Sequence, residues 1–250
     1  MLKIRKILVS QPEPESDKSP YHELAQNNSI KVDFRPFIQV KGVSGKEFRK
    51  NKINILDHTA VIFTSRTASD HFFRICEELR ITVPDEMKYF CISESIAFYL
   101  QKYIVYRKRK IFFGNRRFED LVDVLMKNKD EKFLLPMSDI HKQNIPNKLS
   151  RLKLKYTKAI LYRTMSCDLS DLADVNYDIL VFYSPSGIKS LLQNFPDFKQ
   201  NSTRIASFGP TTAKAVKEAG LRLDIQAPMS KAPSMTMALD MYIKKHNKNK

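Results

Sequence analysis

Serine, threonine and glycine residues gather directly after two apolar runs in the second half of the chain. The run from Leu180 to Tyr183 is followed by Ser184, Ser186 and Gly187, and the run from Arg204 to Phe208 is followed by Gly209, Thr211 and Thr212. Each group precedes a stretch with helical periodicity, and a helix start carries backbone N–H groups that have no partner inside the helix. Such groups bind carboxylates and phosphates. Two of these turns in series predict a site for a ligand with several negative groups.

Proline and glycine bracket the second of these stretches. Pro210 suits the first position of a helix, where its missing N–H is not needed. Gly220 suits the left-handed position that commonly ends a helix. Thr211 and Thr212 are then either caps of this helix or contacts to a ligand, and the two roles are compatible.

The same arrangement occurs once more in the first half of the chain. Val61 to Ala68 matches Leu180 to Gly187 at one fixed offset, and Tyr89 to Ala97 matches Ile205 to Ala213 at another. The matches add three candidate binding residues, Thr64, Ser65 and Ser93. Two related α/β halves would explain this pattern. Chance is the alternative, since any two strand–turn–helix units share an apolar run and a Ser or Thr cap.

Apolar runs that indicate strands alternate with helical periodicity along most of the chain. The expected strands are Lys6 to Ser10, Lys31 to Phe37, Ala60 to Thr64, Lys88 to Ile92, Lys110 to Phe113, Lys132 to Leu135, Lys158 to Tyr162, Asp178 to Tyr183, Arg204 to Phe208 and Arg222 to Ile225. The expected helices include Ala68 to Leu79, Glu94 to Lys102, Phe118 to Lys127, Ile145 to Lys153, Thr211 to Ala219 and Ser234 to Lys244. This alternation predicts an α/β fold with parallel sheets and crossover helices. In such sheets ligands bind beyond the carboxyl ends of the strands, where the turns described above are expected to lie.

Composition indicates a soluble globular protein that is long enough for two domains. The 250 residues are 42% hydrophobic and 28% charged, and no apolar run is long enough to cross a bilayer. Ile7 to Ser10 is too short for the core of a signal peptide. We therefore expect a cytoplasmic protein that does not bind a membrane. Cys76, Cys91 and Cys167 are widely spaced and are expected to be reduced thiols.

The charge of the chain is strongly positive. A formal net charge of +16 concentrates anions near the surface without selecting among them. Nucleic acid is not expected as a partner, because zinc-finger spacing, aromatic–glycine RNA-binding motifs and a helix-turn-helix pattern are missing. Gly-x-Gly-x-x-Gly and Walker-type loops are missing too, which disfavours dinucleotides and nucleoside triphosphates. No cofactor and no metal are expected.

With these turns in place, the sequence resembles the uroporphyrinogen-III synthase family. The resemblance rests on Val61 to Ser65, Leu161 to Thr164, Val181 to Gly187 and Phe208 to Ala213, and it extends at low similarity from Ile7 to about Ile243. Its most specific part is the motif Ser-Pro-Ser-Gly followed by Gly-Pro-Thr-Thr-Ala.

The resemblance implies two Rossmann-like α/β domains with parallel sheets, joined by a two-stranded linker. One domain would combine residues 1–36 with 166–250, the other would span 43–157, and the linker strands would be 37–42 and 158–165. Phe37 to Lys41 and Ala159 to Thr164 are also rich in β-branched and aromatic residues, which favour an extended chain.

The resemblance further implies a cofactor-free lyase of porphyrin and heme biosynthesis. Such an enzyme closes hydroxymethylbilane, a linear tetrapyrrole with many carboxylates, into uroporphyrinogen III. Water leaves from a hydroxymethyl group, an azafulvene cation forms, and the last pyrrole ring is inverted through a spiro intermediate. The protein has to fold a flexible polyanion and supply a proton. A monomer that acts on this small-molecule substrate is expected.

Tyr162 matches a linker tyrosine of the family, and its phenol is the expected proton or hydrogen-bond donor to the leaving hydroxyl. The alternative is that strand alternation simply puts Tyr162 on a packing face. The residues implied to bind substrate are Thr64, Ser65, Ser93, Ser184, Ser186, Gly187, Gly209, Thr211 and Thr212. Ser138 is a weaker candidate, and the five histidines are expected to be structural or solvated.

The loop after the first strand departs from the family pattern. Where the family commonly carries an arginine, Ser10 to Pro12 offers none, and Glu13, Glu15 and Asp17 follow. Acidic side chains there would weaken the binding of a polyanion, and Arg66 would compensate only in part. The alternative function is therefore a non-catalytic two-domain protein that binds a small anion or nucleic acid.

Overall fold

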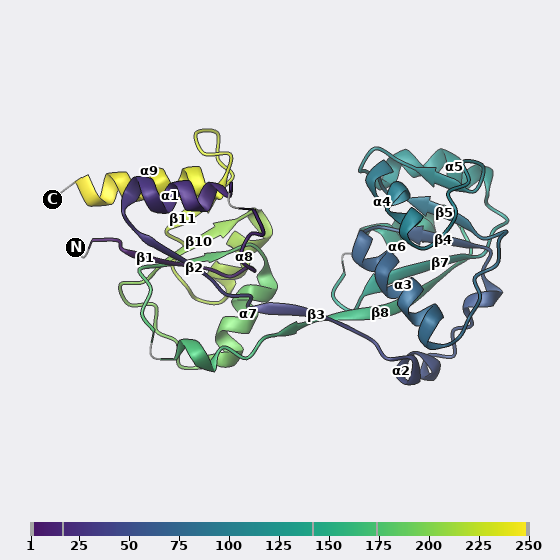
Figure 1. Ribbon diagram of the computed structural model, residues 1–250, viewed down its shortest axis with the longest axis horizontal. Coiled ribbons are helices and arrows are strands. Elements are labelled where there is room, and N and C mark those ends of the chain that lie inside the picture. The colour runs from purple at the N-terminus through teal and green to yellow at the C-terminus, as the bar shows by residue number, and fades with distance from the viewer. Residues whose placement is uncertain (1–2, 17, 142, 174, 249–250) are drawn as a thin grey trace. The chain divides into compact units, whose positions relative to one another are not determined.

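The computed structural model describes residues 3–16, 18–141, 143–173 and 175–248 (Figure 1). The chain divides into two compact units. Unit 1 is Met1–Gln39 with Met165–Lys250, and unit 2 is Val40–Thr164. The domain segments that the resemblance implies, 1–36 with 166–250 and 43–157, lie inside these two units. Asp17 of the acidic first loop lies outside the described residues.

Unit 1 is built on a five-stranded parallel sheet in the order β11-β10-β9-β1-β2. Its strands are β1 (Lys6–Val9), β2 (Lys31–Phe34), β9 (Ile179–Phe182), β10 (Arg204–Phe208) and β11 (Ile225–Ala227). Helices α1 (Pro20–Asn28) and α9 (Met235–Lys248) lie side by side on one face of the sheet (Figure 1). Helices α7 (Pro185–Asn194) and α8 (Pro210–Glu218) cover the other face.

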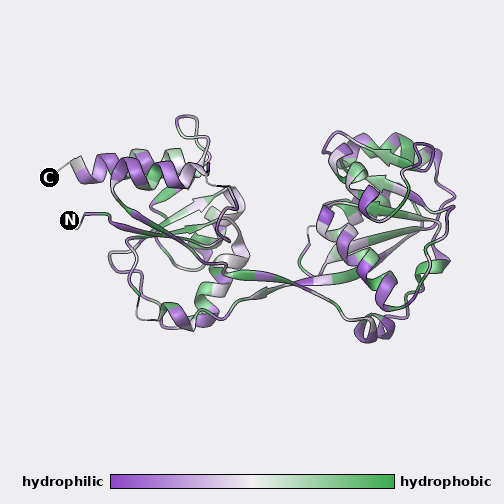
Figure 2. Ribbon diagram, in the orientation of Figure 1, coloured by the Kyte–Doolittle hydropathy of each residue, from purple (hydrophilic) through white to green (hydrophobic). Residues whose placement is uncertain are grey.

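Both faces of this sheet are buried in apolar cores. Ile179 and Val181 of β9 pack in the core with α1 and α9, whereas Leu180 and Phe182 pack in the core with α7 and α8. Side chains of a strand alternate between the two faces, so a strand that is covered on both sides is apolar throughout. Figure 2 shows hydrophobic residues, in green, concentrated in the central strands and hydrophilic residues, in purple, on helices and connections.

Unit 2 contains a six-stranded sheet in the order β3-β8-β7-β4-β5-β6. The strands are β3 (Ile38–Gly42), β4 (Ala60–Phe63), β5 (Lys88–Cys91), β6 (Ile111–Phe113), β7 (Phe133–Ser138) and β8 (Tyr156–Ser166). Helices α2 (Gly45–Lys50), α3 (Arg66–Glu78) and α4 (Glu94–Tyr99) pack in one core, and α5 (Val122–Lys127) and α6 (Asn144–Arg151) pack in the other. Short 3₁₀ turns occur at Ile55–Asp57, Leu100–Lys102, Phe118–Leu121 and Ser170–Leu172. The chain passes between the units in β3 and in β8.

The two sheets share one strand order. The order β11-β10-β9-β1-β2 in unit 1 corresponds strand by strand to β6-β5-β4-β7-β8 in unit 2, and β3 is an additional edge strand of unit 2. In unit 1 the last two strands of this order, β1 and β2, come from the beginning of the chain. The internal match in the sequence therefore corresponds to equivalent places in the two sheets, and the expected α/β class is confirmed.

Some expected elements are wrong in their bounds. The strand expected from Arg222 to Ile225 lies later, at Ile225–Ala227, because the backbone N–H of Arg222 donates to Gln200 Oε1 at 2.7 Å and not to a neighbouring strand. The strand expected from Lys31 to Phe37 stops at Phe34, since Pro36 has no N–H to donate to a neighbouring strand.

Helix α1 is missing from the expected helices. Only Tyr21 and Leu24 of its residues are buried, so its apolar periodicity is weak. The signal that would have found it is Ser19, whose hydroxyl caps the helix, followed by Pro20 in the first turn. No helix among the described residues is long and apolar enough to cross a membrane.

Candidate functional site

Ser184 begins helix α7 directly after β9 in unit 1. Its backbone is extended, with φ −149° and ψ 152°, and its Oγ accepts the N–H of Gly187 at 3.2 Å. A Cβ atom on Gly187 would lie 3.2 Å from Cδ1 of Phe182, so glycine lets the helix start approach the strand closely. Ser186 is half-buried in the same turn. The first predicted turn is thus a helix start capped by serine.

Gly209 begins helix α8 after β10, with φ of +86°, which glycine adopts without strain. Its N–H donates to Ala227 O at 2.6 Å, and no atom lies within 4 Å of the position that a Cβ would take. Helix α8 has no side-chain cap, so the interpretation of Thr211 and Thr212 as capping residues is wrong. Thr211 is exposed, whereas Thr212 is buried at 1% exposure. No side-chain hydroxyl therefore caps the first-turn N–H groups of α8, and uncapped groups of this kind can bind an anion.

These two turns lie at the same edge of the sheet, because β9 and β10 are parallel neighbours. Ser10, which follows β1, joins them: the Cβ position of Gly187 is 3.6 Å from Ser10 Oγ and 3.8 Å from Ser184 Oγ. Ser10 is absent from the predicted site, although its place after a buried strand could have indicated it. Glu13 and Glu15 of the loop that follows are exposed.

Unit 2 carries a second set of turns at the carboxyl ends of β4 and β5. Thr64 and Ser65 follow β4, and Ser65 caps α3 by accepting the N–H of Ala68 on Oγ at 3.0 Å. The backbone of Ser65, with φ −160° and ψ 159°, repeats that of Ser184. Ser93 follows β5, but its Oγ contacts Ser95 Oγ at 3.0 Å and caps nothing. The two halves therefore match at Ser65 and Ser184, which both cap a helix, and the second turn lacks a side-chain cap in both halves, at Ser93 as at Gly209.

A pocket of about 460 Å³ opens beside Ser93, and its lining includes Arg116 and Asp120. Arg116 is exposed and has a positive φ of 71°. Asp120 accepts the backbone N–H groups of Asn115 at 2.9 Å and of Arg117 at 3.2 Å, so its charge serves the turn itself. Arg116 thus contributes a cation to the same pocket lining as Ser93, and the sequence analysis had not included this arginine among the candidates.

Tyr162 lies on β8 in unit 2 and is half-buried at the border of an apolar core. Its ring stacks on the ring of His71, with centroids 4.9 Å apart and an interplanar angle of 18°. Its hydroxyl makes no hydrogen bond to a described residue. The ring is therefore held by packing while the hydroxyl is left without a partner among those residues, so packing and proton donation are compatible roles.

Asp139 holds the segment that carries Tyr162. Its N–H donates to Tyr162 O at 3.1 Å, and its Oδ1 accepts the N–H of Thr164 at 3.2 Å. The same Oδ1 accepts a hydrogen bond from the Ser138 hydroxyl at 2.9 Å. Ser138 was the weaker binding candidate in the sequence analysis, and its hydroxyl already has this partner within the protein. Burial acts to raise the pKa of Asp139, but hydrogen bonds from Ser138, Ile140 and Thr164 outweigh it and lower this pKa.

We expect the contact between Asp139 and Thr164 to weaken in acid. Because the folded-state pKa is lowered, the carboxylate stabilises the fold above the ordinary aspartate pKa of about 3.9 and loses this contribution as the pH falls through the folded value. The hydrogen-exchange protection factor of the Thr164 amide should therefore fall as the pH is lowered below about 4. Asp139→Asn, which keeps an acceptor without the charge, should show no such change. Constant protection in the unmodified protein would contradict this account.

Two substitutions of Ser184 distinguish the role of its hydroxyl as a helix cap from a role in binding a ligand. Ser184→Ala should destabilise unit 1 by about 1 kcal/mol, whereas Ser184→Gly should cost only a few tenths of a kcal/mol, because glycine is a tolerable first residue. Urea unfolding followed by circular dichroism measures this difference. If the hydroxyl also binds substrate, both variants raise KM by a similar factor. A wild-type KM in both would refute the binding role.

Metal ligands do not gather in the described part of the chain: no group of three or more His, Cys, Asp and Glu side chains there is placed to hold a metal ion. Each unit by itself offers helix starts and hydroxyl groups at the carboxyl ends of its strands, and unit 2 also carries the stacked Tyr162. Parallel strands with such turns at their carboxyl ends define a two-unit, Rossmann-like α/β protein. A family model described as uroporphyrinogen-III synthase HemD matches residues 19–237. The chain belongs to the uroporphyrinogen-III synthase family, and the resemblance found in the sequence is confirmed.

Individual relatives agree with this assignment. The uroporphyrinogen-III synthase of Saccharomyces cerevisiae is 26% identical over an alignment of 128 residues that covers 44% of this chain and 46% of the yeast protein. The match therefore spans about half of that relative's length.

Solved structures show the same fold. Uroporphyrinogen-III synthetase from Helicobacter pylori superposes with a TM-score of 0.62 at 17% identity, covering 97% of this chain and 100% of that one. A mutant uroporphyrinogen III synthase from the extremely thermophilic bacterium Thermus thermophilus gives a TM-score of 0.57 at 13% identity, covering 96% and 99%. The expected architecture of two α/β domains is thus confirmed.

Proposed function

We propose that this protein is a cofactor-free lyase that closes hydroxymethylbilane into uroporphyrinogen III with inversion of the last pyrrole ring. The observation that carries the proposal is the family match over residues 19–237. The geometry supports it, because both units offer uncharged donors at the carboxyl ends of their strands. A substrate with several carboxylates is the kind of ligand that such donors bind.

Substrate binding is assigned to the turns that follow the parallel strands. The proposed binding residues are Thr64, Ser65, Ser93, Ser184, Ser186, Gly187, Gly209, Thr211 and Thr212. One exposed helix start contributes only about 0.3–1 kcal/mol towards an anion, whereas micromolar affinity requires roughly 8 kcal/mol. Several turns must therefore each hold a carboxylate, and the net charge of +16 adds a general attraction.

Tyr162 is the proposed proton donor. Its phenol gives a proton to the hydroxyl of the hydroxymethyl group, the C–O bond breaks, and water leaves with the formation of an azafulvene cation. Ring closure to a spiro intermediate, followed by reopening and a second closure, inverts the last ring. The proton that the ring carbon finally loses restores the phenol. A phenol is a weak acid, so its position relative to the leaving oxygen matters more than its acidity.

We further propose that the protein acts in the cytoplasm as a monomer and without a nucleic-acid partner. The support against a nucleic-acid partner is in the sequence, where zinc-finger spacing, aromatic–glycine RNA-binding motifs and a helix-turn-helix pattern are missing. Light scattering on the purified protein measures the oligomeric state.

Product analysis tests the proposed reaction. Purified protein is incubated with hydroxymethylbilane, the products are oxidised, and the porphyrin isomers are separated by chromatography. The type III isomer is expected, while a reaction without protein gives the type I isomer by spontaneous closure. If only type I forms at an excess of protein over substrate, the lyase proposal is wrong and the non-catalytic alternative stands.

A further inference from the structure

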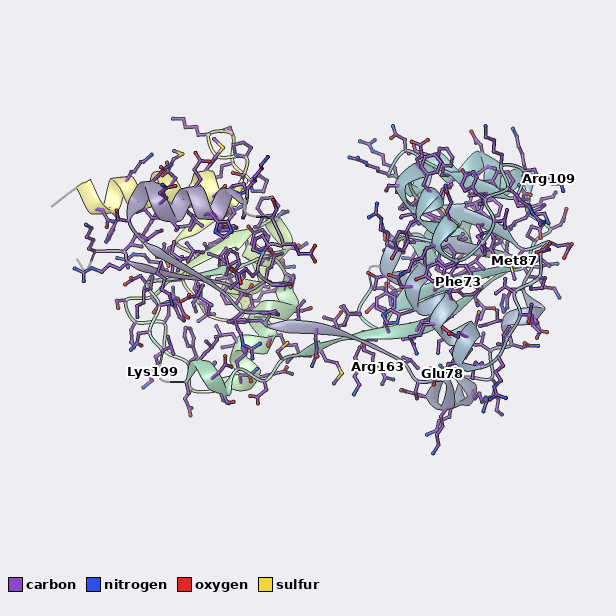
Figure 3. The ribbon with its side chains drawn as sticks, in the orientation of Figure 1. Phe73, Glu78, Met87, Arg109, Arg163 and Lys199 are labelled. Carbon is purple, nitrogen blue, oxygen red and sulfur yellow. The ribbon has the colours of Figure 1, made fainter. Side chains whose placement is uncertain are left out.

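His71 presents the face of its imidazole ring to the ring of Tyr162. The centroids are 4.9 Å apart, and the planes differ by 18°. His71 lies on α3, the helix that Figure 3 marks with Phe73 and Glu78, while Tyr162 lies on β8 of the same unit. Because a phenol oxygen lies in the plane of its ring, a stacked partner restricts the directions in which that oxygen can point.

Arg74 fixes the imidazole of His71 in turn. Its Nε donates to His71 Nδ1 at 3.2 Å, one turn along the helix. Its Nη2 donates to the backbone oxygen of Val43 at 2.6 Å and to that of Leu161 at 3.5 Å. A Cβ on Gly42 would come within 2.8 Å of Arg74 Cζ, so glycine makes room for the guanidinium against the backbone. The planar guanidinium thus joins α3 to the strand that carries Tyr162.

The imidazole of His71 is neutral. Because Arg74 can only donate, His71 Nδ1 must accept, and the proton of the ring is on Nε2. Burial, and then the positive charge of Arg74, lower the pKa of His71, while Asp70 opposes them more weakly. A neutral ring brings no charge to the phenol, so the contribution of His71 is geometric.

The backbone of Tyr162 is held from a different element. Asp139, in the segment after β7, donates its N–H to Tyr162 O and accepts the N–H of Thr164. The phenol of Tyr162 is therefore constrained both at its ring and at its main chain. These constraints matter if the phenol acts as a proton donor, because a small displacement of a reacting group lowers the reaction rate by a large factor.

We propose that His71 is a positioning residue that sets the direction of the Tyr162 hydroxyl towards the oxygen that leaves the substrate. The inference rests on the proposed function, in which Tyr162 supplies the proton. His71 does not touch the substrate in this account. It acts through the tyrosine ring, and Arg74 acts through His71.

Steady-state kinetics on matched variants tests this role. His71→Ala, which removes the stacked ring, should lower kcat for the type III isomer about tenfold and leave KM within about twofold. His71→Phe, which restores a flat ring, should keep kcat within about threefold of wild type. In the Tyr162→Phe background, where no hydroxyl remains to be directed, His71→Ala should change the residual kcat by less than about twofold.

His58→Ala is the control for loss of a histidine from the same unit. His58 is buried, with 9% exposure, just before β4, so it lies at the opposite edge of the sheet from Tyr162. Its replacement should leave kcat near wild type. Should His71→Ala melt at a much lower temperature, His71→Leu, which keeps apolar bulk without a ring, is compared in its place.

Two results would overturn the positioning role while type III activity persists. One is a wild-type kcat in His71→Ala. The other is an equal loss in the Tyr162 and Tyr162→Phe backgrounds, which would mark a general structural effect. If the unmodified protein makes only the type I isomer, the proposed function itself fails and this inference fails with it.

Discussion

Tyr162→Phe should lower kcat for uroporphyrinogen III by more than tenfold, since a positioned acid contributes about a hundredfold or more. The variant keeps the ring and its stack on His71 and removes only the hydroxyl. That hydroxyl bonds to no described residue, so its removal should change the free energy of unfolding by less than about 0.5 kcal/mol. Initial rates from the isomer assay, together with urea unfolding, measure both quantities.

Tyr156→Phe is the matched control. Tyr156 lies on the same strand as Tyr162, but its hydroxyl is hydrogen-bonded within the protein and has no proposed role in catalysis. Its hydroxyl contacts Ser150 Oγ at 3.0 Å and donates to Pro146 O at 3.0 Å. Loss of these bonds should cost about 1 kcal/mol of stability and leave kcat unchanged. Unchanged turnover in Tyr162→Phe would show that the phenol is dispensable and would move the search for the acid to another group.

Phe182→Ala should destabilise unit 1 by about 3–5 kcal/mol. The side chain is fully buried at the end of β9 and meets Phe37 edge to face, with ring centroids 5.5 Å apart. It also lies beneath the first turn of α7, because the Cβ position of Gly187 is 3.2 Å from its Cδ1. The cavity left by the substitution removes the side chain against which the Ser184 turn packs. Because this turn is proposed to bind substrate, we also expect a higher KM.

Urea unfolding followed by circular dichroism measures this loss. A protein of two units need not unfold in one step, and only the transition of unit 1 should move. Met241→Ala in α9 of the same unit is the control, since a side chain with 47% exposure should change stability by less than about 0.5 kcal/mol. An unfolding curve of Phe182→Ala within that range would show that the site tolerates the cavity.

The features that the sequence predicted are local ones. Strand β9 was predictable because a parallel strand covered on both faces is apolar throughout. The helix starts at Ser65 and Ser184 were predictable because each hydroxyl accepts an N–H only three residues further on. The second pair of turns was predicted less well, since Gly209 offers no hydroxyl and the Ser93 hydroxyl bonds to another serine.

The features that the sequence did not predict depend on contacts between distant residues. The stack of His71 on Tyr162 joins a helix to a strand far along the chain, and no local pattern signals it. The approach of Ser10 to Ser184 follows from the pairing of β1 with β9. Strand order decides such contacts, and a single sequence contains only the order along the chain.

The strand order of unit 1 has a consequence for synthesis on the ribosome. Strand β1 is hydrogen-bonded on one side to β2 and on the other to β9, which begins at Ile179. At translation speeds of about 5–20 residues per second, the nascent chain waits on the order of ten seconds before that second neighbour emerges. Residues 40–164 are contiguous and meet no such delay. The amino-terminal strands therefore spend that interval with an unpaired edge, at the stage when a chaperone has most reason to bind.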